Sequence, residues 1–284
     1  MARADRRQLP PGKFRTVNGI NWHYEEWGDS GFPLVLVHGY LGSSANWRPA
    51  ARRLAHSFRV FAVDLPGAGY SDRPVSAPYT LPWFADQLLA FVDSLGLDRP
   101  LLGGHSFGGA IAILAAARRP DLARGMVLVA PLAYHQRPPP GLRYAEKYPG
   151  LALRFFSSEL GKAIIPRLVR KSAYASATTR KSVRVTRLID HLDAPGGWEA
   201  ATTMGLAALK DAPAQLELAR IRVPVLLAWG HYDRVHNVRC ADRMAADFGG
   251  PVTVQILEGS AHHAHEEEVK EFVRLISEFV TGIT

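Results

Sequence analysis

Short runs of Val, Leu and Ile alternate along this chain with longer segments of helical periodicity, and this alternation constrains the fold most. The apolar runs occupy residues 34–38, 59–64, 100–105, 125–130, 224–229 and 252–257. Their nearly continuous apolar character is typical of parallel strands that are buried on both faces. Strands that alternate with helices predict an α/β fold, here a mostly parallel twisted sheet flanked by helices.

A hairpin and three helices are expected around these runs. The Asn18-Gly19 pair predicts a tight β-hairpin turn near the N-terminus. Thr80 is expected to cap a helix that opens with Pro82, and residues 107–118 are apolar enough for a buried helix. The last helix has its apolar residues at helical spacing, namely Val269, Phe272, Val273, Ile276 and Val280.

The alternation stops between Pro131 and Pro213, where helical patterns replace buried strands. Structureless loops of that length are rare inside compact domains, so the stretch is interpreted as an inserted helical cap. We therefore expect an α/β core formed by residues 1–131 and 214–284, and a cap, or lid, formed by residues 132–213. The cap should cover the carboxyl ends of the strands.

Charge is distributed unevenly along the chain. The formal net charge is +8, and the stretch from Leu132 to Gln215 holds thirteen Lys or Arg against six Asp or Glu, which is +7 of that total. A solvated basic face is the simplest interpretation, and weak attraction to acidic substrates or anionic membranes is the alternative. No zinc-ligand spacing, P-loop, dinucleotide fingerprint or nucleic-acid motif is present, so no metal, cofactor or nucleic-acid partner is predicted.

The compartment is predicted from what the sequence lacks. The basic N-terminus is not followed by an apolar stretch of signal-peptide length, and no run of about 18 apolar residues occurs. A cytoplasmic protein is therefore expected. The lone cysteine, Cys240, has no partner for an intramolecular disulfide and lies where a helix is expected to begin, so it is interpreted as a packing residue.

A G-x-S-x-G motif follows the apolar run at 100–105. Its serine is Ser106, the flanking glycines are Gly104 and Gly108, and a helical pattern begins at Phe107. This strand, turn and helix context is the one that the motif requires for a nucleophilic serine on a strained turn. The glycines are needed because side chains there would collide with the strand and the helix. Ser106 is therefore the candidate nucleophile, with His105 as part of the supporting turn.

A serine hydroxyl needs a nearby base, and the base in turn needs a carboxylate. Three histidines follow the last predicted strand, and His262, the first of them, is favoured over His263 and His265. Asp233 directly follows the run at 224–229 and is the candidate carboxylate. A second place for the acid, after the run at 125–130, reads PLAYHQR and holds no carboxylate. The predicted triad is therefore Ser106, Asp233 and His262, in the chain order expected of this architecture.

Two backbone N–H groups are expected to stabilise the negative oxygen of a tetrahedral intermediate. One is that of Phe107, at the start of the helix after the nucleophile. The other is that of Tyr40, because His38 and Gly39 let the backbone turn sharply after the first apolar run. The segment from Asp64 to Asp72 is rich in turn residues and is interpreted as structural. Aromatic candidates for a pocket, which are as readily core residues, are Trp47, Trp83, Tyr134, Tyr144 and Trp198.

These motifs resemble those of the α/β-hydrolase superfamily. They are HGYLGS and DLPGAGYSD after two early strands, GHSFGG at the nucleophile, GHYD near the acid, and GSAHHAHEE near the histidine. The resemblance covers residues 14–131 and 214–282 and implies a hydrolase, but it selects no substrate. Relatives often have glycine before the histidine, where this chain has Ala261. Haloalkane dehalogenases and epoxide hydrolases use aspartate in place of Ser106, so the serine indicates acyl chemistry.

The leading hypothesis is a carboxylesterase that cleaves small or medium acyl esters through an acyl-enzyme on Ser106. Alternatives within the fold are a carbon–carbon bond hydrolase, an amidase or aminopeptidase, and a cofactor-free haloperoxidase or perhydrolase. A lipase-like variant follows from the basic cap. A ligand-binding receptor with a vestigial triad is the alternative that is not an enzyme. The sequence predicts neither the acyl length nor the oligomeric state.

Overall fold

The computed structural model describes residues 11–134, 147–181, 189–210 and 214–283. Eight strands form a single sheet in the order β1-β2-β4-β3-β5-β6-β7-β8. The strands are β1 (Lys13–Val17), β2 (Ile20–Trp27), β3 (Phe32–Val37), β4 (Phe58–Val63), β5 (Leu101–His105), β6 (Gly125–Val129), β7 (Val225–Gly230) and β8 (Val252–Leu257). β1 and β2 pair antiparallel, β2 also pairs antiparallel with β4, and all later pairs are parallel. The predicted α/β-hydrolase fold, a mostly parallel sheet, is therefore confirmed.

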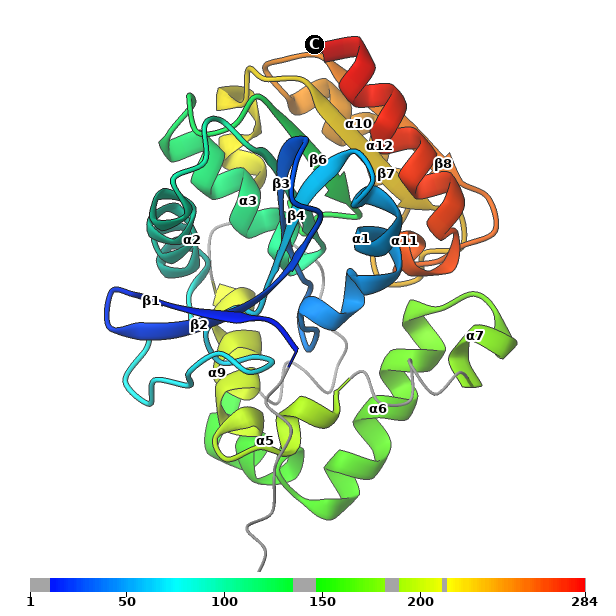
Figure 1. Ribbon diagram of the computed structural model, residues 1–284. Helices are drawn as coiled ribbons and strands as arrows, with labels where there is room; N and C mark the ends of the chain where they lie inside the picture. The colour runs from blue at the N-terminus through cyan, green and yellow to red at the C-terminus, as the bar shows by residue number, and fades with distance from the viewer. Residues whose placement is uncertain (1–10, 135–146, 182–188, 211–213, 284) are drawn as a thin grey trace, which may run out of the picture.

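Helices cover both faces of this sheet (Figure 1). The α-helices are α1 (Arg48–Leu54), α2 (Leu81–Leu95), α3 (Phe107–Arg118), α5 (Pro149–Phe156), α6 (Glu159–Ala173), α7 (Ala177–Lys181), α9 (Gly197–Lys210), α10 (Cys240–Asp247), α11 (Ala264–Glu267) and α12 (Val269–Ile283), and the 3-10 helices are η1 (Ser44–Asn46), η2 (Asp190–Asp193) and η3 (Ala214–Arg220). Buried residues of α2, α3 and α10 pack on one face of the sheet, and those of α1 and α12 pack on the other. β3 shows the alternation that this requires, because Val35 and Val37 join the first cluster while Leu34 and Leu36 join the second.

The predicted hairpin turn and the predicted start of α2 both have the local geometry that they require. Asn18 and Gly19 both have positive φ, 50° and 75°, as a type I′ turn between β1 and β2 requires. The Thr80 side chain accepts a hydrogen bond from the Trp83 N–H at 3.3 Å at the start of α2. The run at 252–257 matches β8 at both ends, whereas the other five predicted strands differ by one or two residues at one end or both. The run at 125–130 ends at Val129, because Ala130 has a φ of 41° that a strand cannot contain.

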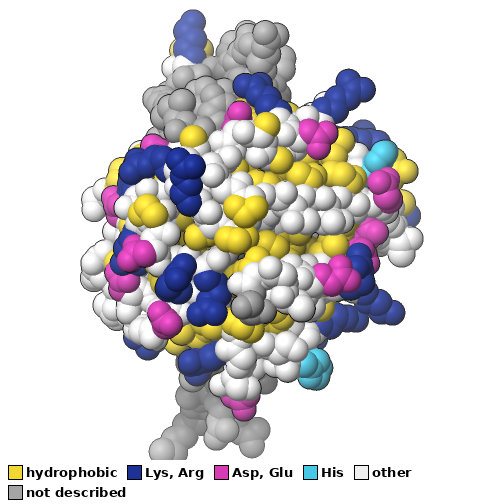
Figure 2. Space-filling model, turned by 90° about the horizontal axis from the view of Figure 1, so that it is seen from above, with side chains coloured by type: hydrophobic (Ala, Val, Ile, Leu, Met, Phe, Trp, Pro, Cys, Tyr) yellow, Lys and Arg dark blue, Asp and Glu magenta, His cyan; other side chains and the backbone are white. Residues whose placement is uncertain are grey.

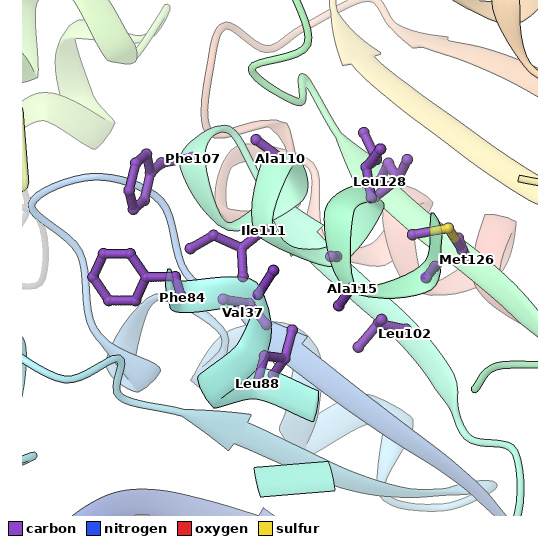
Figure 3. Packing of buried hydrophobic residues seen from close by; sticks show 14 of the residues in the cluster. Val37, Phe84, Leu88, Leu102, Phe107, Ala110, Ile111, Ala115, Met126 and Leu128 are labelled. Atoms are coloured by element: carbon purple, nitrogen blue, oxygen red, sulfur yellow. The ribbon is translucent and has the colours of Figure 1, made fainter. Parts of the chain in front are cut away.

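Helix α3 packs in the core against the sheet and against α2. Figure 3 shows Phe107 and Ile111 of α3 beside Phe84 of α2 and Val37 of β3. The Phe107 and Phe84 rings meet edge to face, with centroids 5.5 Å apart. Phe107 directly follows Ser106, so this packing fixes the end of the helix at which the candidate nucleophile lies.

Four α-helices between β6 and β7 lie apart from the sheet layers. α5, α6, α7 and α9 occupy the lower part of Figure 1, and we call the described residues 147–181 and 189–210 the helical segment. Within these residues no strand occurs. The helical character expected of this stretch is confirmed for them, whereas its status as a separate cap domain with boundaries at 131/132 and 213/214 stays a prediction.

Candidate active site

Ser106 lies between the last residue of β5 and the first residue of α3. Its backbone has φ 49° and ψ −113°, a combination that strains any residue with a side chain. Three backbone hydrogen bonds hold it there: the Ser106 N–H donates to the Val129 oxygen at 2.9 Å, and the Ser106 oxygen accepts the N–H groups of Leu132 at 2.9 Å and Ala110 at 3.1 Å. The serine is 8% exposed, so its hydroxyl is nearly enclosed.

The glycines of the motif are required by close backbone contacts. A Cβ atom on Gly104 would lie 2.4 Å from the Gly108 oxygen, and one on Gly108 would lie 2.3 Å from the His38 oxygen. Both distances are far inside van der Waals contact, so a larger residue would force the strand and the helix apart. The structure therefore shows the collision with strand and helix that the sequence predicts for side chains at these positions.

His262 and Asp233 come together at the carboxyl ends of β8 and β7. The His262 Nδ1 and the Asp233 Oδ2 are 2.8 Å apart, and both residues are buried. The other oxygen of Asp233, Oδ1, accepts the N–H groups of Val235 and His236, each at 2.8 Å. Burial raises the pKa of Asp233, but the charge and hydrogen bond of His262 and the His236 N–H outweigh it, so the pKa is lowered. An ionised Asp233 fixes the Nδ1–H tautomer of His262 and leaves Nε2 as an acceptor.

Ser106 and His262 are linked through His105. The His105 Nε2 lies 2.9 Å from the His262 carbonyl oxygen, and the two rings have centroids 4.6 Å apart. Ser106 is the next residue after His105, so the candidate nucleophile and base share one edge of the sheet. Among the contacts of the described residues there is no hydrogen bond between the Ser106 hydroxyl and His262. In sites without substrate this bond is often long, and it tightens when substrate binds.

The turn after β3 brings Tyr40 to the same edge. His38 Nδ1 donates to the Gly39 oxygen at 2.8 Å, and its Nε2 accepts the Leu65 N–H at 3.1 Å, which fixes the turn. A Cβ atom on Gly39 would lie 2.6 Å from His105 Nδ1, so this turn packs against the residue before Ser106. The Tyr40 side chain donates to the Ala201 oxygen of α9 at 3.0 Å and thereby joins the turn to the helical segment.

The other predicted oxyanion donor is the N–H of Phe107. Phe107 is the first residue of α3, so its N–H has no acceptor within the helix and is free to point at a ligand. The positive end of the helix dipole adds to the attraction for a negative oxygen. Of the donors predicted from the sequence, Phe107 directly follows Ser106, and Tyr40 follows Gly39, which packs against His105.

His236 is a neighbour of the candidate base that sequence reasoning missed. Its Nδ1 donates to the Ala130 oxygen at 2.9 Å, and its ring meets the His262 ring edge to face at 4.8 Å. Burial, followed by the nearby His262, lowers the pKa of His236 to about 4, so this ring is neutral at neutral pH. The only sequence signal is its position three residues after Asp233, in a turn whose path the sequence does not reveal.

Glu267 is a second missed residue, and it joins the helical segment to the loop of the candidate base. Its Oε1 accepts the N–H groups of Ala175 at 3.0 Å and Ser176 at 3.2 Å, while its Oε2 accepts the Ala261 N–H at 2.9 Å. Ala261 precedes His262 directly. In the same region the His263 N–H donates to the Ala173 oxygen at 3.2 Å. The position of the helical segment and the position of His262 are therefore coupled through one carboxylate.

The segment from Asp64 to Asp72 has the structural role that the sequence suggested. Asp64 is buried, and its Oδ2 lies 2.7 Å from His23 Nδ1 and accepts the Tyr70 N–H at 2.9 Å. Its Oδ1 accepts the Ser44 N–H at 2.5 Å. Burial raises the pKa of Asp64, but the hydrogen bond and charge of His23 outweigh this and hold the pKa at about 2. These bonds tie β2, β4 and η1 together behind the site.

The aromatic pocket candidates are mostly core residues. Trp47 and Trp198 are buried, and Tyr134 donates to Asp247 Oδ2 at 2.7 Å. Tyr144 lies outside the described residues, and Trp83 packs on Phe84 within α2. A pocket of about 260 Å³ lies where the helical segment meets the turn around Asp233, and its lining is Ser172, Tyr174, Ala175, Arg180, Tyr232 and Arg234.

Charges of both signs mix on the end of the molecule that is uppermost in Figure 1. Figure 2 shows Lys and Arg interspersed with Asp and Glu on that face, so no single-sign patch forms there. Within the described residues no helix has both the length and the apolar character needed to cross a bilayer. The predicted compartment remains a prediction.

Comparison with known proteins fixes the family. A family model described as the alpha/beta hydrolase fold matches residues 33–269. The chain belongs to this family. An uncharacterized hydrolase of Bacillus subtilis (strain 168) is 28% identical over 269 residues, covering 93% of this chain and 94% of that protein. A pimeloyl-acyl-carrier-protein methyl ester esterase of Aeromonas salmonicida (strain A449) is 29% identical over 256 residues, covering 87% and 94%.

Solved structures agree with this assignment. A thermophilic esterase from Thermogutta terrifontis superposes with a TM-score of 0.80 at 24% identity, covering 96% of this chain and 99% of that chain. At this identity the likeness establishes the fold alone. The α/β-hydrolase recognised from the sequence motifs is thus confirmed as a family, and the bond that it cleaves is a separate question.

Proposed function

We infer that this protein is a serine hydrolase that cleaves carboxylic esters of small to medium acyl substrates through an acyl-enzyme on Ser106. The observation that carries the proposal is the strained backbone of Ser106 at the same sheet edge as a buried histidine and aspartate pair. Strain of this kind persists where the surrounding structure holds it for a purpose. The methyl ester esterase among the relatives supports ester cleavage at the level of similarity.

In the first half of the proposed reaction, Ser106 Oγ attacks the ester carbonyl carbon while His262 Nε2 removes the hydroxyl proton. Asp233 stabilises the imidazolium that forms, since its carboxylate is ionised and accepts the Nδ1–H. The carbonyl oxygen becomes an oxyanion that accepts the N–H groups of Phe107 and Tyr40. The intermediate then collapses, the carbon–oxygen bond to the alcohol breaks, and His262 returns the proton to the leaving alcohol.

The second half repeats these steps with water in place of the alcohol. His262 removes a proton from water, the resulting nucleophile attacks the acyl carbon, and the acid leaves as Ser106 regains its proton. No metal or redox cofactor enters the balance. We assign the helical segment to substrate selection, because Tyr40 and Glu267 join it to both sides of the proposed site.

The test is a substrate panel applied to the wild-type protein and to Ser106→Ala. We expect multiple turnover of p-nitrophenyl acetate, butyrate or octanoate that disappears in the variant. Cleavage of vinylogous diketones without ester turnover would instead support a carbon–carbon bond hydrolase. Preferred turnover of anilides would support an amidase or aminopeptidase, and peroxide-dependent halogenation would support a perhydrolase. If no substrate is turned over but ester analogues still bind, the result would support a ligand-binding receptor with a vestigial triad.

A further inference from the structure

Three buried histidines gather behind the proposed catalytic residues. They are His105, which precedes Ser106, and His263 and His265, which follow His262. Each offers a ring nitrogen, and these nitrogens all lie within 4.8 Å of one another. The ring centroid of His105 is 4.5 Å from that of His263 and 4.8 Å from that of His265. None of the three belongs to the proposed triad, so the cluster requires a separate explanation.

The hydrogen bonds of two of these histidines select the tautomer that a metal ligand needs. His105 Nε2 faces the His262 carbonyl oxygen at 2.9 Å, and a carbonyl only accepts, so Nε2 carries the proton and Nδ1 keeps its lone pair. That Nδ1 is buried and has no hydrogen-bond partner among the described residues. His263 Nδ1 lies 2.8 Å from Glu266 Oε1. With its proton on Nδ1, His263 keeps the lone pair on Nε2.

Imidazoles that bind metal in proteins show this same arrangement. The second ring nitrogen donates to a backbone carbonyl or to a carboxylate, which fixes the ring and increases its basicity. His105 has the carbonyl partner and His263 has the carboxylate partner. Gly39 packs closely beside His105 Nδ1, because a Cβ atom there would lie 2.6 Å from that nitrogen, so only glycine leaves room for the ring.

Glu266 is itself held in place by further hydrogen bonds, as expected of a carboxylate that orients a metal-binding histidine. Its side chain is buried, and Oε1 accepts the Asn46 amide at 2.7 Å and the Tyr174 hydroxyl at 3.1 Å besides facing His263. The same oxygen lies 3.9 Å from His265 Nε2. One carboxylate therefore contacts two of the three histidines.

Aromatic side chains pack on two of the three rings. The Tyr174 ring stacks on His263 with centroids 4.6 Å apart and an angle of 15°. The Trp47 ring lies 4.2 Å from the His265 ring. The His105 ring is tilted to both of these histidine rings, and the His263 and His265 rings lie 5.7 Å apart, so the three form one packed group.

We propose that His105, His263 and His265 bind one divalent transition-metal ion of the zinc class, with Glu266 as the carboxylate that orients His263. Tetrahedral zinc with bonds of about 2.0 Å spaces its ligand nitrogens about 3.3 Å apart. The three nitrogens would therefore close by at most about 1.5 Å, which side-chain rotation supplies. Imidazole ligands suit Zn²⁺, Cu²⁺ and Ni²⁺, whereas Mg²⁺ and Ca²⁺ prefer oxygen.

The ion would act as a cross-link and not as a reagent. His105 ends β5 directly before the proposed nucleophile, and His263 and His265 follow the proposed base. One ion bonded to all three would hold these two segments together, which stabilises the folded chain without contact to Ser106 or to the imidazole of His262. This inference is independent of the ester chemistry, since its test measures bound metal.

The experiment measures Zn²⁺ bound to full-length protein that has been stripped with a chelator. Because the cluster is buried, Zn²⁺ is added both to the folded protein and during refolding from guanidinium, and bound metal is counted by mass spectrometry after desalting. We expect one ion per chain and a higher Tm that the chelator reverses. Cobalt in place of zinc should give the visible absorption of a tetrahedral nitrogen-ligated ion.

Variants identify the ligands. The double variant His263→Gln with His265→Gln should reduce the affinity for Zn²⁺ at least 100-fold. Glu266→Gln should reduce it by about 10-fold to 100-fold, as expected when the carboxylate that orients a ligand histidine is lost. A matched control replaces the exposed histidines His56 and His231 by glutamine and should keep the full stoichiometry. The proposal is overturned if neither loading leaves an ion on the wild-type protein. It is equally overturned if the ion is lost only in the control, which would mean surface binding.

Discussion

Glu267→Gln is the most informative single change outside the proposed triad. Glu267 uses both oxygens at once: Oε1 accepts from Ala175 and Ser176 in the helical segment, and Oε2 accepts from Ala261 beside His262. Glutamine has nearly the same shape but only one oxygen. Whichever way its amide group turns, an NH₂ group must face a backbone N–H on one of the two sides.

The magnitude follows from those contacts. A hydrogen bond to a charged group contributes about 1.5 to 3 kcal/mol, and a buried donor left without an acceptor costs about 1 to 3 kcal/mol. The free energy of unfolding should therefore fall by about 2 to 4 kcal/mol. For a chain of this size this corresponds to a decrease in Tm of roughly 4 to 8 °C. Because one side of the change lies next to His262, kcat should fall as well.

Urea unfolding followed by circular dichroism measures the stability, and ester turnover measures kcat and KM. Glu258→Gln is the matched control, because Glu258 pairs with His231 on the surface and its side chain is 76% exposed. Exposed pairs contribute at most about 1 kcal/mol. If Glu267→Gln unfolds at the same urea concentration as the control, the coupling between the helical segment and the loop of His262 has been misread.

Three further predictions concern the candidate acid Asp233, the buried carboxyl of Asp64, and the basic charge of the chain. Asp233→Asn should lower kcat/KM about 10⁴-fold with an unchanged circular dichroism spectrum, because the amide favours the wrong His262 tautomer; rates like those of the wild type would require another carboxylate. The lowered pKa of Asp64 stabilises the folded protein above about pH 4, so the contribution of Asp64 to the free energy of unfolding should drop by about 2 kcal/mol between pH 4 and pH 2, and Asp64→Asn should lose about that much less stability than the wild type over this range in urea titrations. Anionic vesicles should increase ester turnover only weakly at low salt; a large increase that is lost at high salt would show that a lipid surface is the substrate.

Most of the core fold was predictable because its signals are local. The buried runs, the Asn18-Gly19 turn and the Thr80 cap each need only a few neighbouring residues, and each was found at its predicted place. Strand ends were less predictable. The end of β6 depends on the positive φ of Ala130, and that residue carries no glycine-like signal in the sequence.

The residues that surround the proposed site were only partly predictable. The pairing of His262 with Asp233 is predictable because both follow strands of one parallel sheet, whose carboxyl ends lie together. The contact of His105 with the His262 carbonyl joins residues 157 positions apart, and the bonds of Glu267 join segments about 90 positions apart. Such contacts depend on how two turns approach each other in space. The three-histidine cluster was missed for the same reason, since its members come from two distant turns and match no zinc-ligand spacing.

Covalent labelling with a fluorophosphonate tests the central claim most directly, because the reagent reacts with a serine that a base has activated. The account predicts one adduct per chain on the peptide that contains Ser106, no adduct in Ser106→Ala, and labelling slowed by orders of magnitude in His262→Ala. An adduct on another residue, or labelling of Ser106 at an undiminished rate without His262, would contradict it.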